Sequence, residues 1–274
     1  MECELESRFE VSRTTNYIHS RNFTRVALQF PDELLKYSTK VVSSLRNKLL
    51  SLKASNASEV KEDVRFFVMA DTTFGSCCVD EVGASHISAD CVIHYGHTCL
   101  SPTSSLPAFF VFGKSPMDIS SCAKKIFNYA SAASKPVLVL YGLEYAHIIM
   151  HLKEVMLEAT SSSVSNIKLN FQVADVTCYT MNPSVNYENS CAALESYVDS
   201  FQDDDASAST SNKYRIGGLT WNLPQQRKMG EYLLFWIGDN NSAFENVVLT
   251  FNGCEIGELG SNFTFLTFTC VLLW

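Results

Sequence analysis

The sequence lacks an excess of positive charge, a long apolar run and a recognisable leader. Of its 274 residues, 21 are Lys or Arg and 29 are Asp or Glu, so the net charge is −8. This balance argues against a generally basic nucleic-acid-binding protein. No stretch reaches the roughly 18 apolar residues of a membrane-spanning helix, and the start, MECELESRFEV, lacks the basic and apolar regions of a secretory signal. We therefore expect a cytoplasmic protein with no nucleic-acid or membrane partner.

Several motifs of common enzymes are also missing. The sequence contains no G-x-G-x-x-G, no G-x-x-x-x-G-K-[ST] and no G-x-S-x-G, which removes the usual evidence for dinucleotide binding, phosphate-loop chemistry and serine hydrolysis. His147 and His151 have the spacing of a zinc pair on a helix, but they lack the Glu of H-E-x-x-H. A place on the surface or in the core is the better interpretation of both.

Cysteine, in contrast, is abundant. The chain has ten cysteines, and the stretch 70–102 holds Cys77, Cys78, Cys91 and Cys99. The C-x-x-C pairs of a zinc ribbon are absent. A reducing compartment weakens the disulfide interpretation, so burial in the core and thiolate ligation of an iron–sulfur cluster or zinc remain open. Burial in the core is favoured for Cys91, which opens a predicted strand, and for Cys122, which lies in a predicted helix. Cys254 is also expected to be structural.

Runs rich in Val, Phe and Leu alternate with segments of helical period. This pattern predicts an α/β fold of parallel sheets with flanking helices, the strands being buried on both faces. The predicted strands lie near residues 26–30, 64–71, 91–96, 108–113, 136–142 and 168–175.

Cys77 and Cys78 follow the second predicted strand, and Cys99 follows the third. Ligands bind such sheets just past the carboxyl ends of the strands. We expect these two strands to be neighbours, so that Cys78 and Cys99 face one cavity. His97, in the same turn as Cys99, is a candidate hydrogen-bond donor beside a cluster or an anion, whereas His94, inside a strand, is expected in the core.

Three blocks of the sequence resemble the eukaryotic diphthamide synthase family. They are RVALQFPDELL, ADTTFGSCCVDEVGASHISADCVIHYGHTCLSP and IGGLTWNLP with EYLLFWIGDNNSAFENVVLTFNGCEI. The likeness extends from about Arg25 to Ile256 and is greatest to subunit 2 of the family. It implies two of the family's three α/β domains. The first domain is expected at 25–135, with the cysteine-rich loops, and the second at 136–256, with an acidic loop near 193–213. An N-terminal extension is expected at 1–24 and a divergent tail at 257–274.

The resemblance implies a subunit of the complex for the first step of diphthamide biosynthesis. In that step a 3-amino-3-carboxypropyl group passes from S-adenosylmethionine to a histidine of elongation factor 2. The expected partners are subunit 1, in a heterodimer, elongation factor 2 as substrate, and an electron-donor protein. Subunit 2 is expected to be auxiliary and not catalytic alone, supporting reduction of the cluster in subunit 1.

By position, Cys78 and Cys99 match two ligands of the family's 4Fe–4S cluster. The third family ligand lies in a third domain, beyond the extent of this sequence, so a truncated form is expected. Cys77 or Cys178 could replace that ligand. Two alternatives stay open: a scaffold or binding protein without a complete cluster, and a zinc protein that uses Cys77, Cys78 and Cys99.

Overall fold

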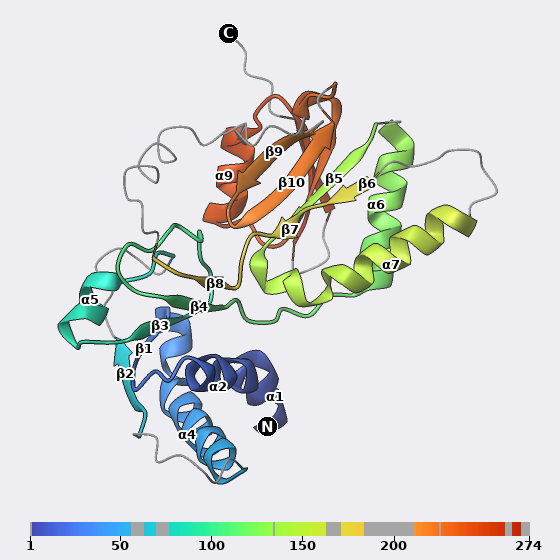
Figure 1. Ribbon diagram of the computed structural model, residues 1–274. Helices are drawn as coiled ribbons and strands as arrows, with labels where there is room; N and C mark the ends of the chain where they lie inside the picture. The colour runs from blue at the N-terminus through green and yellow to red at the C-terminus, as the bar shows by residue number, and fades with distance from the viewer. Residues whose placement is uncertain are drawn as a thin grey trace. The chain divides into compact units, whose positions relative to one another are not determined.

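The chain forms two compact units, each built on a largely parallel sheet (Figure 1). The computed structural model describes residues 2–55, 63–69, 77–133, 135–162, 171–183, 211–224, 226–260 and 265–269. The first unit comprises Met1–Lys114 and Cys178–Cys191, and the second comprises Ser115–Thr177 and Ala192–Trp274. The chain thus passes between units after Lys114, whereas the family resemblance implies a boundary near residue 135.

The sheet of the first unit has the strand order β2-β1-β3-β4-β8. The first four strands are parallel, and β8 runs antiparallel to β4 at the edge. Their bounds are β1 (Arg25–Gln29), β2 (Arg65–Met69), β3 (Cys91–Tyr95), β4 (Ala108–Val111) and β8 (Thr180–Met181). The chain goes from β1 outward to β2 and then returns past β1 to β3, so the strand order reverses at β1.

Successive residues of β1 serve the two faces of this sheet, as the pleat requires. Val26 and Leu28 pack in a cluster with α2 (Val11–Ser20) and α4 (Ser38–Ser55). Ala27 faces the opposite side, where Ala84 of the short helix α5 (Glu81–His86) covers it. Helix α1 (Glu2–Arg8) contacts α2, and α3 (Asp32–Leu35) follows β1 directly. The two connecting helices, α4 and α5, therefore lie on opposite faces.

The second unit has a sheet of order β13-β12-β11-β5-β6, in which only β13 is antiparallel to its neighbour. A smaller antiparallel sheet has the order β7-β10-β9. The strands are β5 (Val137–Tyr141), β6 (Phe171–Val173), β7 (Asp175–Val176), β9 (Ser211–Ile216), β10 (Leu219–Pro224), β11 (Leu233–Ile237), β12 (Glu255–Leu259) and β13 (Phe265–Thr269). The helices are α6 (Ile119–Ala133), α7 (Ala146–Ser162), α9 (Ser242–Thr250) and the 3-10 turns η1 (Leu143–Tyr145) and η3 (Met229–Glu231).

The predicted α/β class with parallel sheets is confirmed. Residues 2–20 of the expected N-terminal extension form α1 and α2. The acidic loop expected near 193–213 lies outside the described residues up to residue 210, and β9 begins at Ser211. Beyond Ile256 the backbone continues in β12 and adds β13, so the described part of the expected tail belongs to the sheet.

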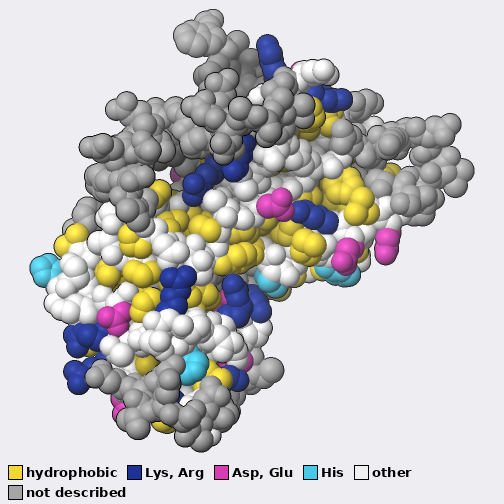
Figure 2. Space-filling view, viewed as in Figure 1, with side chains coloured by type: hydrophobic (Ala, Val, Ile, Leu, Met, Phe, Trp, Pro, Cys, Tyr) yellow, Lys and Arg dark blue, Asp and Glu magenta, His cyan; other side chains and the backbone are white. Residues whose placement is uncertain are grey.

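The surface in Figure 2 is mixed in character. On the face shown, Lys and Arg side chains are interspersed with acidic and apolar ones. Among the described residues, no helix combines the length and the apolar character needed to cross a membrane.

The first prediction concerns the cluster beneath the first sheet. Leu45 of α4 is fully buried there, whereas Leu50 of the same helix is 60% exposed. Leu45→Ala should destabilise the fold by about 2–5 kcal/mol, because it leaves a cavity. Leu50→Ala, the matched control, should change stability by no more than about 0.5 kcal/mol. Urea unfolding followed by far-UV circular dichroism measures both, and equal losses would contradict the packing described.

Candidate metal centre

Three thiols meet at the carboxyl edge of the first sheet. The Sγ atoms of Cys77 and Cys78 lie 3.6 Å apart, and the Sγ atoms of Cys78 and Cys99 also lie 3.6 Å apart. All three sulfurs are within 4.8 Å of one another, and each residue is partly buried. Among the described residues, this is the only group of three or more Cys, His, Asp or Glu ligand atoms gathered so closely. The thiols that the sequence placed near one cavity, Cys78 and Cys99, are brought together.

The route by which they meet differs from the expectation. The strands before Cys78 and Cys99 were predicted to be neighbours, but β1 lies between β2 and β3. That prediction was wrong because the chain returns past β1 after forming β2. The two loops must therefore span about 10 Å of sheet, two strand spacings, to meet over the end of β1. This position is the point where strand order reverses, a common place for ligands in open α/β sheets.

Gln29, the last residue of β1, holds the first of these loops. Its side-chain Nε2 donates to the backbone carbonyl of Cys78 at 2.8 Å, and its Oε1 accepts from the backbone N–H of Asp80 at 2.9 Å. The residue is only 1% exposed. An amide matches one carbonyl and one N–H at once, so Gln29 fixes the backbone directly after the two cysteines. No sequence pattern marks Gln29 as a site residue, because its role depends on the strand order.

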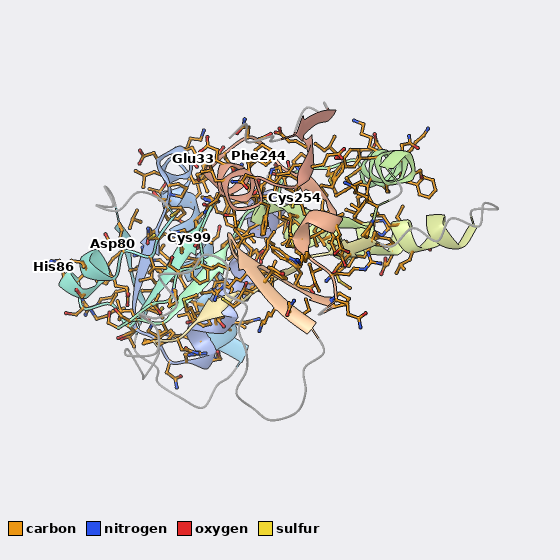
Figure 3. All side chains as sticks on the ribbon, turned by 90° about the horizontal axis from the view of Figure 1, so that it is seen from above. Glu33, Asp80, His86, Cys99, Phe244 and Cys254 are labelled. Atoms are coloured by element: carbon orange, nitrogen blue, oxygen red, sulfur yellow. The ribbon has the colours of Figure 1, made fainter. Side chains whose placement is uncertain are left out.

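Asp80 and α5 continue from this loop. The Asp80 carboxylate caps the helix by accepting from the backbone N–H of Gly83 at 2.8 Å. A Cβ at Gly83 would lie 2.6 Å from that carboxylate, so the close approach requires glycine. Figure 3 shows Asp80 at the start of α5, toward Cys99, and His86 at the far end of the helix. His86 is exposed and lies outside the thiol group.

The loop that carries Cys99 is bent at both sides of the thiol. Gly96 has φ +90°, and a Cβ there would lie 3.0 Å from Cγ of Pro31. Leu100 adopts φ 52°, which costs a non-glycine residue of order 1–3 kcal/mol. Its side chain is 1% exposed, so apolar burial offsets that cost. The backbone N–H of Cys99 donates to the carbonyl of Cys77 at 3.3 Å and joins the two loops.

Glu81 fastens the remainder of the Cys99 loop to α5. Its carboxylate accepts from the backbone N–H groups of Ser104, Ser105 and Leu106 and from both serine hydroxyls. Burial alone would raise the pKa of Glu81, but these donors stabilise the charged form and hold its pKa below the ordinary value. A single carboxylate thus closes the loop between β3 and β4.

The three thiols differ in acidity. Burial raises the pKa of Cys77, and it raises the pKa of Cys78 to about 12, with the nearby Cys99 adding to both shifts. Burial also acts on Cys99, but the Ser101 hydroxyl, 3.0 Å from its Sγ, and the neighbouring thiols donate to it and lower its pKa below the ordinary value. Cys99 is therefore the first thiolate of the group.

The other candidates from the sequence lie elsewhere. Three cysteines expected in the core are buried, as predicted: Cys91, Cys122 and Cys254. Cys178 is half-buried and outside the thiol group. His94 is fully buried, its ring 5.7 Å from that of Phe110, which confirms the expected core position.

His97 is partly buried, and burial lowers its pKa, which favours the neutral imidazole. It does not belong to the thiol group. His147 and His151 are exposed on α7, as expected for residues without the metalloprotease Glu.

The donor set fits a soft metal. Thiolates select iron, zinc and copper(I) over magnesium or calcium, and no carboxylate or imidazole of the described chain joins the three sulfurs. Partial burial restricts water without closing the site. Cys78 and Cys99 are the residues that could hold an iron–sulfur cluster, and Cys77 adds a third sulfur beside them.

One prediction tests the Glu81 clamp through pH. Because the pKa of Glu81 is lower in the folded state, its stabilisation is present above the unfolded pKa and is lost as pH falls through the folded value. Glu81→Gln should lower stability at pH 7 by about 1 kcal/mol, after discounting for its partial exposure. The difference should shrink below pH of about 4. Urea midpoints between pH 7 and 3 measure this, with exposed Glu33→Gln as control, and a pH-independent loss would contradict it.

A second prediction follows from thiol acidity. In metal-free, reduced protein near pH 8, iodoacetamide should modify Cys99 before Cys77 and Cys78, because the thiolate is the nucleophile. Ser101→Ala should slow the modification of Cys99 by removing the hydroxyl donor. Peptide mass spectrometry after brief alkylation measures the order. Faster modification of Cys78 than of Cys99 would show that the acidity order is wrong.

Comparison with known proteins places the chain in a family. The model of the diphthamide synthesis protein family, Diphthamide_syn, matches residues 30–260. Two similar proteins are both named 2-(3-amino-3-carboxypropyl)histidine synthase subunit 2. The one from Danio rerio is 30% identical, and the match covers 90% of this chain and 43% of that protein. The one from Schizosaccharomyces pombe is 31% identical, and the match covers 91% of this chain and 41% of that protein. The chain thus spans about two fifths of the length of these relatives.

A solved structure shares the fold. It is Dph2 from Pyrococcus horikoshii with a 4Fe–4S cluster, which superposes with a TM-score of 0.56 at 12% identity, covering 96% of this chain and 61% of that one. The similarity confirms the architecture of the chain.

Proposed function

The chain belongs to the diphthamide synthesis protein family, and we propose that it is a subunit of the complex for the first step of diphthamide biosynthesis. That complex transfers the 3-amino-3-carboxypropyl group of S-adenosylmethionine to a histidine of elongation factor 2. Its relatives in Danio rerio and Schizosaccharomyces pombe carry the name of subunit 2. This name supports a place in a complex with another subunit. The proposed role is that of an auxiliary subunit that pairs with subunit 1 in the cytoplasm.

The observation that carries the proposal is the convergence of Cys78 and Cys99. Their sulfurs lie 3.6 Å apart where the strand order of the first sheet reverses. The solved protein with the same fold contains a 4Fe–4S cluster. Cys78 and Cys99 are the residues proposed to bind such a cluster here. Bound at this place, it would supply electrons that keep the catalytic cluster of subunit 1 reduced, after receiving them from an electron-donor protein.

The described residues around the thiols are suited to hold ligands in place. Gln29 fixes the backbone after Cys78, and Glu81 fixes the loop after Cys99. The Ser101 hydroxyl is placed to donate to the Cys99 sulfur. Donors to thiolate sulfurs and limited solvent access are two of the features by which proteins set the potential of iron–sulfur clusters.

The test is co-purification without oxygen. The chain, expressed with subunit 1 and then supplied with iron and sulfide, should be recovered in complex with iron and sulfide in equal amounts. Cys78→Ser and Cys99→Ser should lower the iron that this subunit contributes, whereas Cys178→Ser, outside the thiol group, should not. The variants are measured with a subunit 1 whose own cluster ligands are substituted, so that the iron counted belongs to this chain.

Two outcomes would contradict the proposal. Failure to associate with subunit 1 would show that the chain is not a subunit of this complex. Association without iron would favour a scaffold that holds no cluster.

A further inference from the structure

We propose that the outer edge of β2 and the hollow beside it bind an extended segment of another protein, in which one apolar side chain stands between two acidic ones. The inference goes beyond the proposed function, because it needs neither a cluster nor subunit 1. It rests on three features of the first unit: the edge of β2, a hollow between β2 and α4, and the cations at the two ends of that hollow.

The strand β2 is at one edge of the first sheet. It pairs with β1, and no other described strand lies beside it. The N–H of Arg65 donates to the carbonyl of Thr24 at 2.7 Å, and alternate residues of a strand bond to the same neighbour. Phe66 and Val68 therefore direct their N–H and C=O groups away from β1. An extended segment beside β2 would bond to these groups, which is how peptides add to a sheet edge.

A hollow of about 320 Å³ lies between β2 and α4. One wall comes from the β2 side, where three residues line it: Asp63, Val64 and Phe66. The other wall is one face of α4, with the spacing i, i+3, i+4, i+7: Arg46, Leu49, Leu50 and Lys53.

The middle of the hollow is apolar and open to solvent. Leu50 is 60% exposed, and Val68, on the same face of β2 as Phe66, is 40% exposed. Val64 and Phe66 pack only in part against the cluster beneath the sheet. Edge strands that avoid pairing usually carry charges or proline, whereas β2 has the sequence RFFVM. An apolar side chain of an added segment would bury this surface.

Two cations bracket the leucines. Arg46 and Lys53 are seven residues apart, about 10 Å along the helix. Arg46 is exposed and forms no ion pair with a described residue. Lys53 pairs with Asp63 at 2.9 Å, but the Asp63 side chain is 95% exposed, and exposed pairs contribute little. A carboxylate of the added segment can therefore take the place of Asp63.

The spacing and the charge define the occupant. Side chains on one face of an extended segment recur about every 6.6 Å, so three of them span about 13 Å. An acidic, an apolar and an acidic side chain in this order match Arg46, the leucines and Lys53, whose long side chains cover the remaining distance. A second copy of β2 offers no acidic residue within Arg65–Met69, so charge complementarity favours a different chain.

The experiment uses the full chain and a fluorescein-labelled peptide, Thr-Glu-Thr-Phe-Thr-Glu-Thr, with fluorescence anisotropy as the measurement. We expect saturable binding with a dissociation constant below about 1 mM. Lys in place of both Glu residues should weaken binding about tenfold, because two exposed attractions become repulsions. N-methylation of one alternate set of peptide amides should abolish binding, and methylation of the other set should not, because only one set faces β2.

Variants of the chain test the two walls. Leu50→Ala, which should leave stability almost unchanged, should weaken binding about fivefold through lost apolar contact. Arg46→Glu should weaken binding of the acidic peptide about tenfold and strengthen that of the Lys peptide. Lys48→Glu is the matched control, because this exposed cation lies on the opposite side of α4 and the change in net charge is the same. Circular dichroism shows whether each variant is folded.

Three outcomes would overturn the proposal. The first is an absence of saturable peptide binding, and the second is an equal loss for Arg46→Glu and Lys48→Glu, which would show attraction by net charge alone. The third is self-association of the chain without peptide binding, measured by sedimentation and removed by Val68→Lys, which would assign the edge to a second copy. Iron bound through Cys78 and Cys99 enters none of these measurements, so their failure leaves the proposed function standing.

Discussion

The thiol group depends on one buried amide, that of Gln29. Because β1 lies between β2 and β3, the loops that carry the thiols must meet over the end of β1, where Gln29 stands. The amide joins the carbonyl of Cys78 and the N–H of Asp80 to the sheet at 2.8 and 2.9 Å. An apolar residue there would leave both backbone groups unpaired in the interior, at about 1–3 kcal/mol each. A polar residue at this end of β1, after the apolar Val26–Leu28, is therefore required for a site at this edge.

The other contacts build on that fixed point. Asp80, held by Gln29, begins α5, and Glu81 of the same turn binds the loop that follows Cys99. Both cysteine loops are therefore attached to a single helical turn, one by covalent continuity and the other by a carboxylate. Every contact in this chain of attachments belongs to the first unit. The sulfurs are positioned by that unit's own sheet and helix.

The parallel sheets could be predicted from the sequence, because buried strands such as Cys91–Tyr95 and helices such as Ile119–Ala133 have strong periodic patterns. The meeting of Cys78 and Cys99 could be predicted because both follow such strands, and parallel strands place their carboxyl ends at one edge of the sheet. Strand order could not be predicted in the same way, since no periodicity records which strands pair, and the assumed neighbourhood of β2 and β3 was wrong. The role of Gln29 follows from that order. The antiparallel edge strand β13 also arises from tertiary pairing alone.

Cys77 shows how a local bend decides the chemistry of the group. Had residues 77 and 78 been extended, one sulfur would have faced away, and the edge would have offered the two thiolates that the family resemblance implies. The bend adds a third sulfur, 3.6 Å from that of Cys78. With the main chain of Cys78 fixed by Gln29 and that of Cys99 joined to Cys77, rotation of the side chains is the freedom that remains. The orientation of Cys77 therefore determines whether the edge of the sheet presents two sulfurs or three.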